Sequence, residues 1–225
     1  MYPSLKRILD IFVAAFTLCL LLPLFLPLLL LLRFTAEGAV FYRQTRIGLN
    51  SQPFLIWKFA TMLKNSPNMG SGTITLRHDP RVTPVGRFLR RTKLNELPQL
   101  FNVLRGDMSF VGPRPLDEKG YLAYPEEIRA QVFRVKPGIT GVGSIVFRDE
   151  ERLISASDMN PREFYRQYIA PYKGVLEIWY QKHNGFFTDF LLLLLTGWII
   201  LSPESQLIFK VFPGLPAKPI ALNFE

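Results

Sequence analysis

The side chains best suited to chemistry gather between Arg90 and Pro115. Several basic residues precede the pair Asn95 and Glu96 in this stretch, and Arg114 follows it between two prolines. Arginine can bind two phosphate oxygens at once, and a carboxylate such as Glu96 is a ligand that suits Mg²⁺. The combination indicates a site that binds phosphate groups.

A short amphipathic helix is expected to position these groups. Pro98 is tolerated only in the first turn of a helix, so the predicted helix begins near Asn95, with Asn95 as its N-cap, and ends at Gly106. The polar pair would then lie at the positive end of the helix dipole, which attracts anions. A capped helix with a solvated basic flank is the alternative interpretation. The residues predicted to share the apolar face are Leu97, Leu100, Phe101 and Leu104.

The amino-acid composition limits which kinds of molecule the chain is expected to bind. The chain has 225 residues, a formal net charge of +9 and 48% hydrophobic residues, with leucine concentrated in two blocks. The charge alone would suit nucleic acid, anionic lipid or a phosphorylated substrate. Because no helix-turn-helix pattern, zinc-finger spacing or aromatic RNA-binding signature is present, we expect a membrane surface and no nucleic acid. The single cysteine, Cys19, excludes a disulfide framework.

The first apolar block runs from Ile11 to Leu32 without a charged residue. As a helix it is long enough to cross a bilayer core of about 30 Å. However, Pro23 and Pro27 favour a kink in its middle, and basic residues flank both of its ends. The positive-inside rule places both ends on the cytoplasmic side, so we favour a bent, re-entrant helix-break-helix over a spanning helix.

The rest of the chain predicts a compact domain. Aromatic and β-branched segments around the Gly48-Leu-Asn50 turn predict a β-hairpin, and Thr83-Pro84 opens a short basic helix. A helical stretch is expected over residues 117–132, and the second apolar block, residues 188–201, predicts a buried or interfacial helix. The expected fold class is α+β: an N-terminal re-entrant membrane helix plus a compact cytoplasmic domain of short amphipathic helices and a small β-hairpin. The expected regions are the membrane helix (1–36), the cytoplasmic domain (37–202) and a Pro-rich C-terminal tail (203–225).

A family resemblance is carried by residues 93–115, Lys-Leu-Asn-Glu-Leu-Pro-Gln-Leu-Phe-Asn-Val-Leu-Arg-Gly-Asp-Met-Ser-Phe-Val-Gly-Pro-Arg-Pro. They resemble the signature of the bacterial sugar transferases, the monotopic polyprenyl-phosphate phosphoglycosyl transferases. The resemblance extends from Lys6 to about Thr196. Its other matching segments are Lys6-Arg-Ile-Leu-Asp10, the proline-broken apolar segment, Arg46-Ile-Gly48, Lys58-Phe-Ala-Thr-Met62, Asp79-Pro-Arg-Val-Thr-Pro-Val-Gly-Arg87 and Val135-Lys-Pro-Gly-Ile-Thr-Gly141.

The resemblance implies the transfer of a sugar 1-phosphate from a nucleoside diphosphate sugar, usually a UDP-sugar, to a membrane polyprenyl phosphate. This reaction initiates assembly of an exopolysaccharide, capsule or surface glycan. It also implies Mg²⁺, contact with membrane lipid, and a location at the cytoplasmic face of the bacterial inner membrane; a homo-oligomer is compatible with it. The candidate catalytic residues are Asn95 and Glu96, and Glu96 is also the candidate metal ligand. The candidate substrate- and phosphate-binding residues are Arg46, Lys58, Arg81, Arg87, Arg114 and Arg148.

The sequence departs from the family pattern at its most reactive position. In the family, the position matching Asn95 is typically an aspartate that attacks the substrate, and a neutral amide is a poor nucleophile. Three hypotheses follow: direct attack by the lipid phosphate, attack by Glu96, or a catalytically silent membrane relative that binds donor, lipid or a partner. A non-enzymatic basic adaptor at the membrane surface is the rival from another class. The residues that follow Gly141 also differ from the common pattern, which leaves the nucleotide and sugar preference open, although Arg148 still matches a family arginine.

Overall fold

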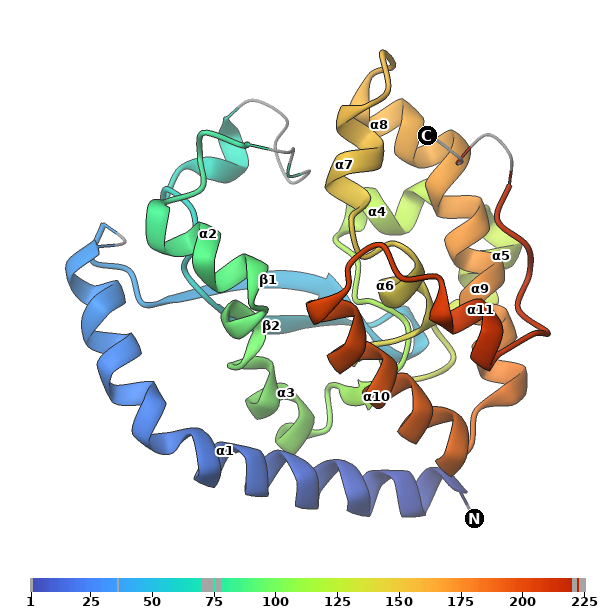
Figure 1. Ribbon diagram of the computed structural model, residues 1–225, viewed down its shortest axis with the longest axis horizontal. Helices are drawn as coiled ribbons and strands as arrows, with labels where there is room; N and C mark the ends of the chain where they lie inside the picture. The colour runs from blue at the N-terminus through green and yellow to red at the C-terminus, as the bar shows by residue number, and fades with distance from the viewer. Residues whose placement is uncertain (1, 36, 70–74, 76–77, 220–221, 223–225) are drawn as a thin grey trace.

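The computed structural model describes all residues except 1, 36, 70–74, 76–77, 220–221 and 223–225. Within the described residues, many helices surround two small sheets (Figure 1). The expected mixture of helices with little sheet is confirmed.

The N-terminal helix α1 (Tyr2–Thr35) is continuous through Pro23 and Pro27. The expected division into two helices is therefore wrong, although the helix is visibly bent along its course (Figure 1). Each proline removes one hydrogen bond, but the flanking leucines are strong helix formers and keep the segment helical. Among the described residues, α1 is the one helix long and apolar enough to cross a membrane.

The predicted hairpin is confirmed. Strands β1 (Phe41–Ile47) and β2 (Pro53–Phe59) pair antiparallel, joined through the short turn η1 (Leu49–Ser51). Tyr42 lies opposite Lys58, and Arg46 lies opposite Phe54. Because side chains alternate between the two faces of a strand, Arg46 and Lys58 share one face of the hairpin.

The signature helix begins later than expected. A 3-10 turn, η3 (Leu94–Glu96), comes first, and α3 (Gln99–Arg105) starts only after Pro98. Asn95 therefore lies inside a tight turn and caps no helix. The turn is opened by Lys93, whose backbone is left-handed at φ 62°, an uncommon conformation for a residue with a side chain. Gly106 ends α3 in the left-handed conformation, as predicted.

The predicted apolar face of α3 is also wrong in part. Phe101 is 43% exposed, whereas Gln99 and Asn102 are buried. The amide of Asn102 explains its burial, because it donates to the carbonyl oxygen of Leu55 and accepts from the backbone N–H of Trp57. The polar side chain of Asn102 thus attaches α3 to β2. A prediction of the buried face from the spacing of apolar residues could not include it.

The C-terminal half begins with β3 (Ser109–Val111), which pairs in parallel with β4 (Gly138–Thr140). The helix expected over residues 117–132 is interrupted at Tyr124, because Pro125 disfavours a helical conformation in the residue before it. The basic helix α2 (Pro84–Arg91) has the predicted cap, since the Thr83 hydroxyl accepts from the N–H of Gly86. The remaining elements are η2 (Ser66–Asn68), α4 (Glu118–Ala123), α5 (Glu126–Val132), α6 (Val142–Val146), α7 (Glu150–Ser155), α8 (Pro161–Phe164), η4 (Tyr165–Ile169), α9 (Ala170–His183), α10 (Phe186–Leu201) and α11 (Leu207–Val211).

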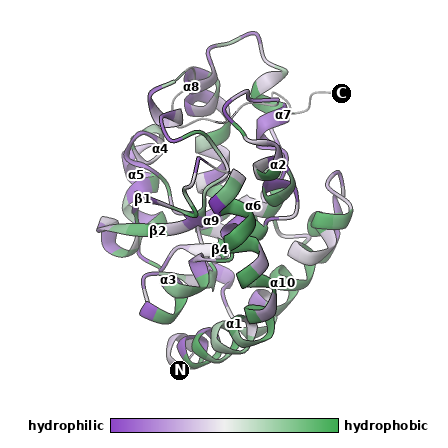
Figure 2. Ribbon diagram, turned by 90° about the vertical axis from the view of Figure 1, so that its left-hand side faces the viewer, coloured by the Kyte–Doolittle hydropathy of each residue, from purple (hydrophilic) through white to green (hydrophobic). Residues whose placement is uncertain are grey.

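Apolar side chains remain exposed along α1 and α10, which are the most hydrophobic helices in Figure 2. On α10 these include Phe187, Leu194 and Leu201, which are 77%, 56% and 80% exposed. Two neighbouring helices with such surfaces are typical of a protein that meets lipid. The segment after Pro203 packs on α9: the hydroxyl of Tyr172 donates to the carbonyl oxygen of Pro216.

Candidate functional site

A cavity of about 1180 Å³ lies between the hairpin, α2, η3, α6 and α7. The hairpin face, the η3 turn and the segment between β3 and α4 each contribute charged side chains to it. It brings together residues that are far apart in the chain, from Thr17 to Ile200. The predicted site residues that line it are Arg46, Lys58, Arg87, Asn95, Glu96, Arg114 and Arg148.

Arg81 is the predicted site residue that the structure does not bring to this cavity. Its side chain is buried and forms an ion pair with Asp79, with 2.6 Å between Nη2 and Oδ2. It also donates to the carbonyl oxygens of Ser66 and Met69. Arg81 therefore holds the loop before α2.

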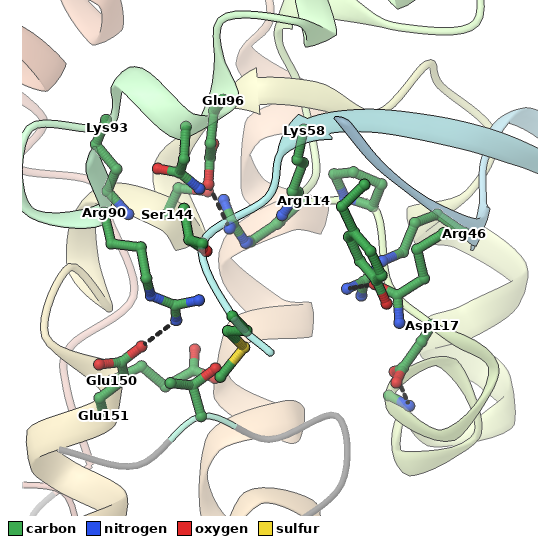
Figure 3. Close-up of a pocket in the computed structure, with 18 of the residues that line it drawn as sticks. Arg46, Lys58, Arg90, Lys93, Glu96, Arg114, Asp117, Ser144, Glu150 and Glu151 are labelled. Atoms are coloured by element: carbon green, nitrogen blue, oxygen red, sulfur yellow. Dashed lines mark hydrogen bonds and ion pairs between the residues drawn. The ribbon is translucent and has the colours of Figure 1, made fainter. Parts of the chain in front are cut away.

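Glu96 is the centre of the site. Its buried carboxylate accepts a hydrogen bond from Arg114, with 2.9 Å between Nη2 and Oε1. Lys58, Lys93 and Arg114 converge around it in Figure 3. Burial alone would raise the pKa of Glu96, but these three cations outweigh burial and hold the pKa well below its usual range. Glu96 is therefore an ionised carboxylate throughout the physiological pH range.

The two lysines are less strongly charged than lysines in water. Burial lowers the pKa of Lys58 to about 7 and that of Lys93 to about 8, although Glu96 opposes the change. Repulsion from Arg114 adds to the lowering in both cases. A ligand with negative charge would restore their protonation, so the site is electrostatically suited to an anion such as a diphosphate.

Two neutral polar groups in the cavity have no hydrogen-bond partner among the described residues. They are Oδ1 of Asn95 and Oγ of Ser144, and both atoms are buried. Leaving such a group unpaired costs about 1–3 kcal/mol, so a partner from a ligand is expected. Ser144 lies beside Glu96 and Lys93 in Figure 3, which places this unpaired hydroxyl at the centre of the site.

Arg46 forms a second cationic group at one side of the cavity, near Asp117 (Figure 3). It donates to Gln44 over 2.6 Å, and its buried Nε has no partner among the described residues. Burial lowers its pKa, with Asp117 acting in the opposite direction. The unpaired nitrogen leaves Arg46 able to donate to a ligand oxygen.

Ion pairs connect the two sides of the cavity. Arg90 on α2 pairs with Glu151 on α7 over 2.7 Å, and the guanidinium of Arg148 donates to the carbonyl oxygen of Arg91. Lys173 on α9, which is buried, forms an ion pair with Glu150. Of these residues, sequence reasoning assigned only Arg148 to the site. It missed Arg90, Glu150, Glu151, Lys173, Asp117 and Ser144, because no motif links elements so far apart in the chain. Lys93 could have been assigned to the site from the sequence, because it is the first residue of the family signature at residues 93–115.

The site residues fit a metal ion only in part. The described residues contain no group of three or more His, Cys, Asp or Glu that could hold an ion. Glu96 could provide one oxygen, and Mg²⁺ commonly binds through one or two carboxylates together with substrate phosphates. The donor set of this site is therefore suited to an ion that arrives with a phosphorylated ligand.

Comparison with known proteins is consistent with this geometry. The bacterial sugar transferase family model matches residues 1–203. The chain is 39% identical to the UDP-glucose:undecaprenyl-phosphate glucose-1-phosphate transferase of Escherichia coli, over 83% of this chain but 39% of that protein's length. It is 36% identical to the uncharacterized sugar transferase EpsL of Bacillus subtilis, over 89% of each chain. It is 40% identical to the exopolysaccharide production protein ExoY of Rhizobium meliloti, over 64% of this chain and 70% of that protein. The chain therefore belongs to the bacterial sugar transferase family.

Proposed function

We propose that this protein transfers a sugar 1-phosphate from a UDP-sugar to a membrane polyprenyl phosphate, and so initiates assembly of an exopolysaccharide or another surface glycan. The observation that carries the proposal is the cavity in which Arg114, Lys58 and Lys93 surround the ionised Glu96. Relatives whose names state this activity support it. A protein that only binds anionic membranes would have no need of a deep cavity with convergent charges.

The cations of the cavity would bind the diphosphate of the donor. Arg114, Lys58 and Lys93 would neutralise the phosphoryl group that is transferred, and Arg46 with its unpaired Nε would bind the nucleotide side. An oxygen of the lipid phosphate forms a bond to the β-phosphorus. The bond between this phosphorus and the bridging oxygen breaks, and UMP leaves with the bonding electrons.

Direct attack by the lipid phosphate is the mechanism that these residues favour. The amide of Asn95 is a poor nucleophile, and Glu96 is held in an ion pair with a pKa well below its usual range. A carboxylate stabilised in this way is weakly nucleophilic. We propose that Glu96 orients Arg114 and Lys58, and that Asn95 accepts a hydrogen bond from the donor through its unpaired Oδ1.

Mg²⁺ is the proposed cofactor, with Glu96 as its protein ligand and the donor phosphates as the others. When bound, the ion would withdraw charge from the diphosphate and stabilise the leaving UMP. We further propose that α1 is re-entrant, with both ends at the cytoplasmic face of the inner membrane. The basic residues at both ends of its apolar run and its bend support this topology.

Purified protein in detergent would test the function. With Mg²⁺, polyprenyl phosphate and a panel of UDP-sugars labelled in the β-phosphate, we expect label in the lipid and an equal amount of UMP. The variant Asn95→Asp provides the comparison. If the natural chain transferred nothing from any donor while Asn95→Asp did, the protein would be a catalytically silent relative, and the proposed function would be wrong.

A further inference from the structure

The cavity has a second, apolar part that the phosphate chemistry does not use. Its lining includes apolar side chains from the η3–α3 region, from β3 and β4, and from the last turn of α10. At about 1180 Å³ the cavity exceeds the usual 300–1,000 Å³ of a pocket for one small molecule. The apolar residues that line this part are Leu97, Leu100, Phe110, Ile139, Ile199 and Ile200; we call them the apolar floor.

The polar groups next to the apolar floor are already paired. The hydroxyls of Thr140 and Thr196 bond to each other over 2.7 Å, and Thr196 also donates to the carbonyl oxygen of Leu192. They therefore have little to offer the hydroxyls of a sugar or the edge of a base. This contrasts with the charged part, where Asn95 and Ser144 have buried unpaired atoms. The two parts of the cavity suit ligand groups of opposite polarity.

The apolar floor also continues toward the apolar surface of the molecule. Ile199 and Ile200 belong to α10, and the adjacent side chains Trp198 and Leu201 of that helix are exposed. Thr17, in the middle of α1, lines the same cavity. In Figure 1 the helices α3 and α10 lie next to each other, and both stand above α1. A chain that entered from lipid between these helices would reach the charged cluster without crossing water.

We propose that the apolar floor binds the isoprenoid chain of the lipid phosphate acceptor, with the phosphate placed next to Glu96, Lys58 and Arg114. This assignment rests on the proposed function. It requires one amphiphilic ligand that occupies both parts of the cavity at once. Water-soluble phosphates lack the apolar portion, and neutral lipids lack the charge.

Two substitutions in the apolar floor test the assignment, Ile139→Gln on β4 and Ile200→Gln on α10. Leu194→Gln is the matched control, because Leu194 is on α10 but is 56% exposed and lies outside the cavity. A polar group placed on an apolar ligand surface weakens binding by roughly tenfold. We expect each cavity variant to raise the KM for the polyprenyl phosphate by about this factor and to leave the KM for the UDP-sugar unchanged. The control should change neither constant. Equal effects in the control, or an effect on the donor KM alone, would overturn the assignment.

A binding measurement separates this inference from the proposed activity. A polyprenyl phosphate with a photoreactive group in its isoprenoid chain is irradiated with the natural protein, and the labelled residues are identified by tandem mass spectrometry. Label on the residues of the apolar floor, competed by unlabelled polyprenyl phosphate, supports the assignment even if no transfer occurs. Label confined to the exposed faces of α1 and α10, or no competable label, refutes it.

Discussion

At the scale of single residues, the site depends on one carboxylate that balances several cations. Glu96 is buried, and its Oε1 is 2.9 Å from Nη2 of Arg114. Burial lowers the pKa values of Lys58 and Lys93, and the negative charge of Glu96 makes this lowering smaller. Removing its charge should therefore weaken the protonation of both lysines and release the guanidinium of Arg114.

The substitution Glu96→Gln is expected to lower kcat/KM for transfer by at least roughly 100-fold, the scale of losing a preorganised electrostatic group. Glu151→Gln is the control, because Glu151 pairs with Arg90 at the rim and its side chain is 44% exposed. A pair of this kind contributes about 1 kcal/mol or less, so its loss should cost no more than about fivefold. Steady-state kinetics of both variants checks the prediction. Similar losses in the two would show that Glu96 has no special role.

Glu177 on α9 provides a prediction about pH. It is buried, and its Oε2 has no partner among the described residues. Burial raises its pKa to about 7 from the ordinary 4.5, while Lys173 acts in the opposite direction. The folded state thus retains a proton that the unfolded chain releases. The resulting stabilisation is complete below pH 4.5 and is lost as the pH rises through 7.

In Glu177→Gln this pH dependence should disappear. The contribution amounts to roughly 3 kcal/mol at most, so the melting temperature of the natural protein should fall by several degrees relative to the variant between pH 5 and pH 8. Thermal unfolding in detergent at several pH values measures this difference. Parallel curves for the two proteins would contradict the raised pKa.

At the scale of elements, close backbone packing sets the position of Arg114. The β3 and β4 strands meet at glycines, and a Cβ added to Gly138 would lie 2.2 Å from the backbone nitrogen of Gly112. Gly112 is two residues from Arg114, and the N–H of Gly138 donates to the carbonyl oxygen of Pro113. The contact between β3 and β4 therefore fixes the segment that carries the arginine.

The variant Gly138→Ala should separate the two strands, since backbone atoms cannot move aside independently. We expect a loss of about 2–4 kcal/mol in stability and a marked loss of transfer. Gly197→Ala on α10 is the control, because no heavy atom lies within 4 Å of its added Cβ. Alanine there should be neutral or stabilising by up to about 1 kcal/mol. Thermal unfolding separates the cases, and equal stability of the two variants would contradict this account.

The sequence predicted an element correctly where one or two residues determine the local backbone conformation. The Thr83-Pro84 cap, the β-hairpin and the glycine that ends α3 are examples. The predicted start of α3 was wrong because a 3-10 turn, opened by the left-handed backbone of Lys93, occupies Leu94–Glu96, and a lysine gives no sequence signal for that conformation. Ser144 and Glu150 were missed at the site because they enter the cavity only after distant helices have packed.

At the scale of the whole molecule, the position of α1 relative to the membrane decides how the site would meet the proposed lipid substrate. The proposed re-entrant topology places Ser4 and Thr35, both exposed, on the cytoplasmic side. In a Cys19→Ser background, Ser4→Cys and Thr35→Cys should both react with a membrane-impermeant maleimide in inside-out vesicles and neither in intact spheroplasts. Reaction of one of them from the outside would show a spanning helix.

The measurement that tests the central claim most directly is exchange of labelled UMP into the UDP-sugar, with and without polyprenyl phosphate. An enzyme that first takes the phosphosugar onto its own side chain catalyses this exchange without lipid, because formation of the covalent intermediate is reversible. With Asn95 at the reactive position and Glu96 bound to Arg114, we predict no exchange without lipid, and UMP release only when the acceptor is present. Exchange in the absence of lipid would contradict direct attack.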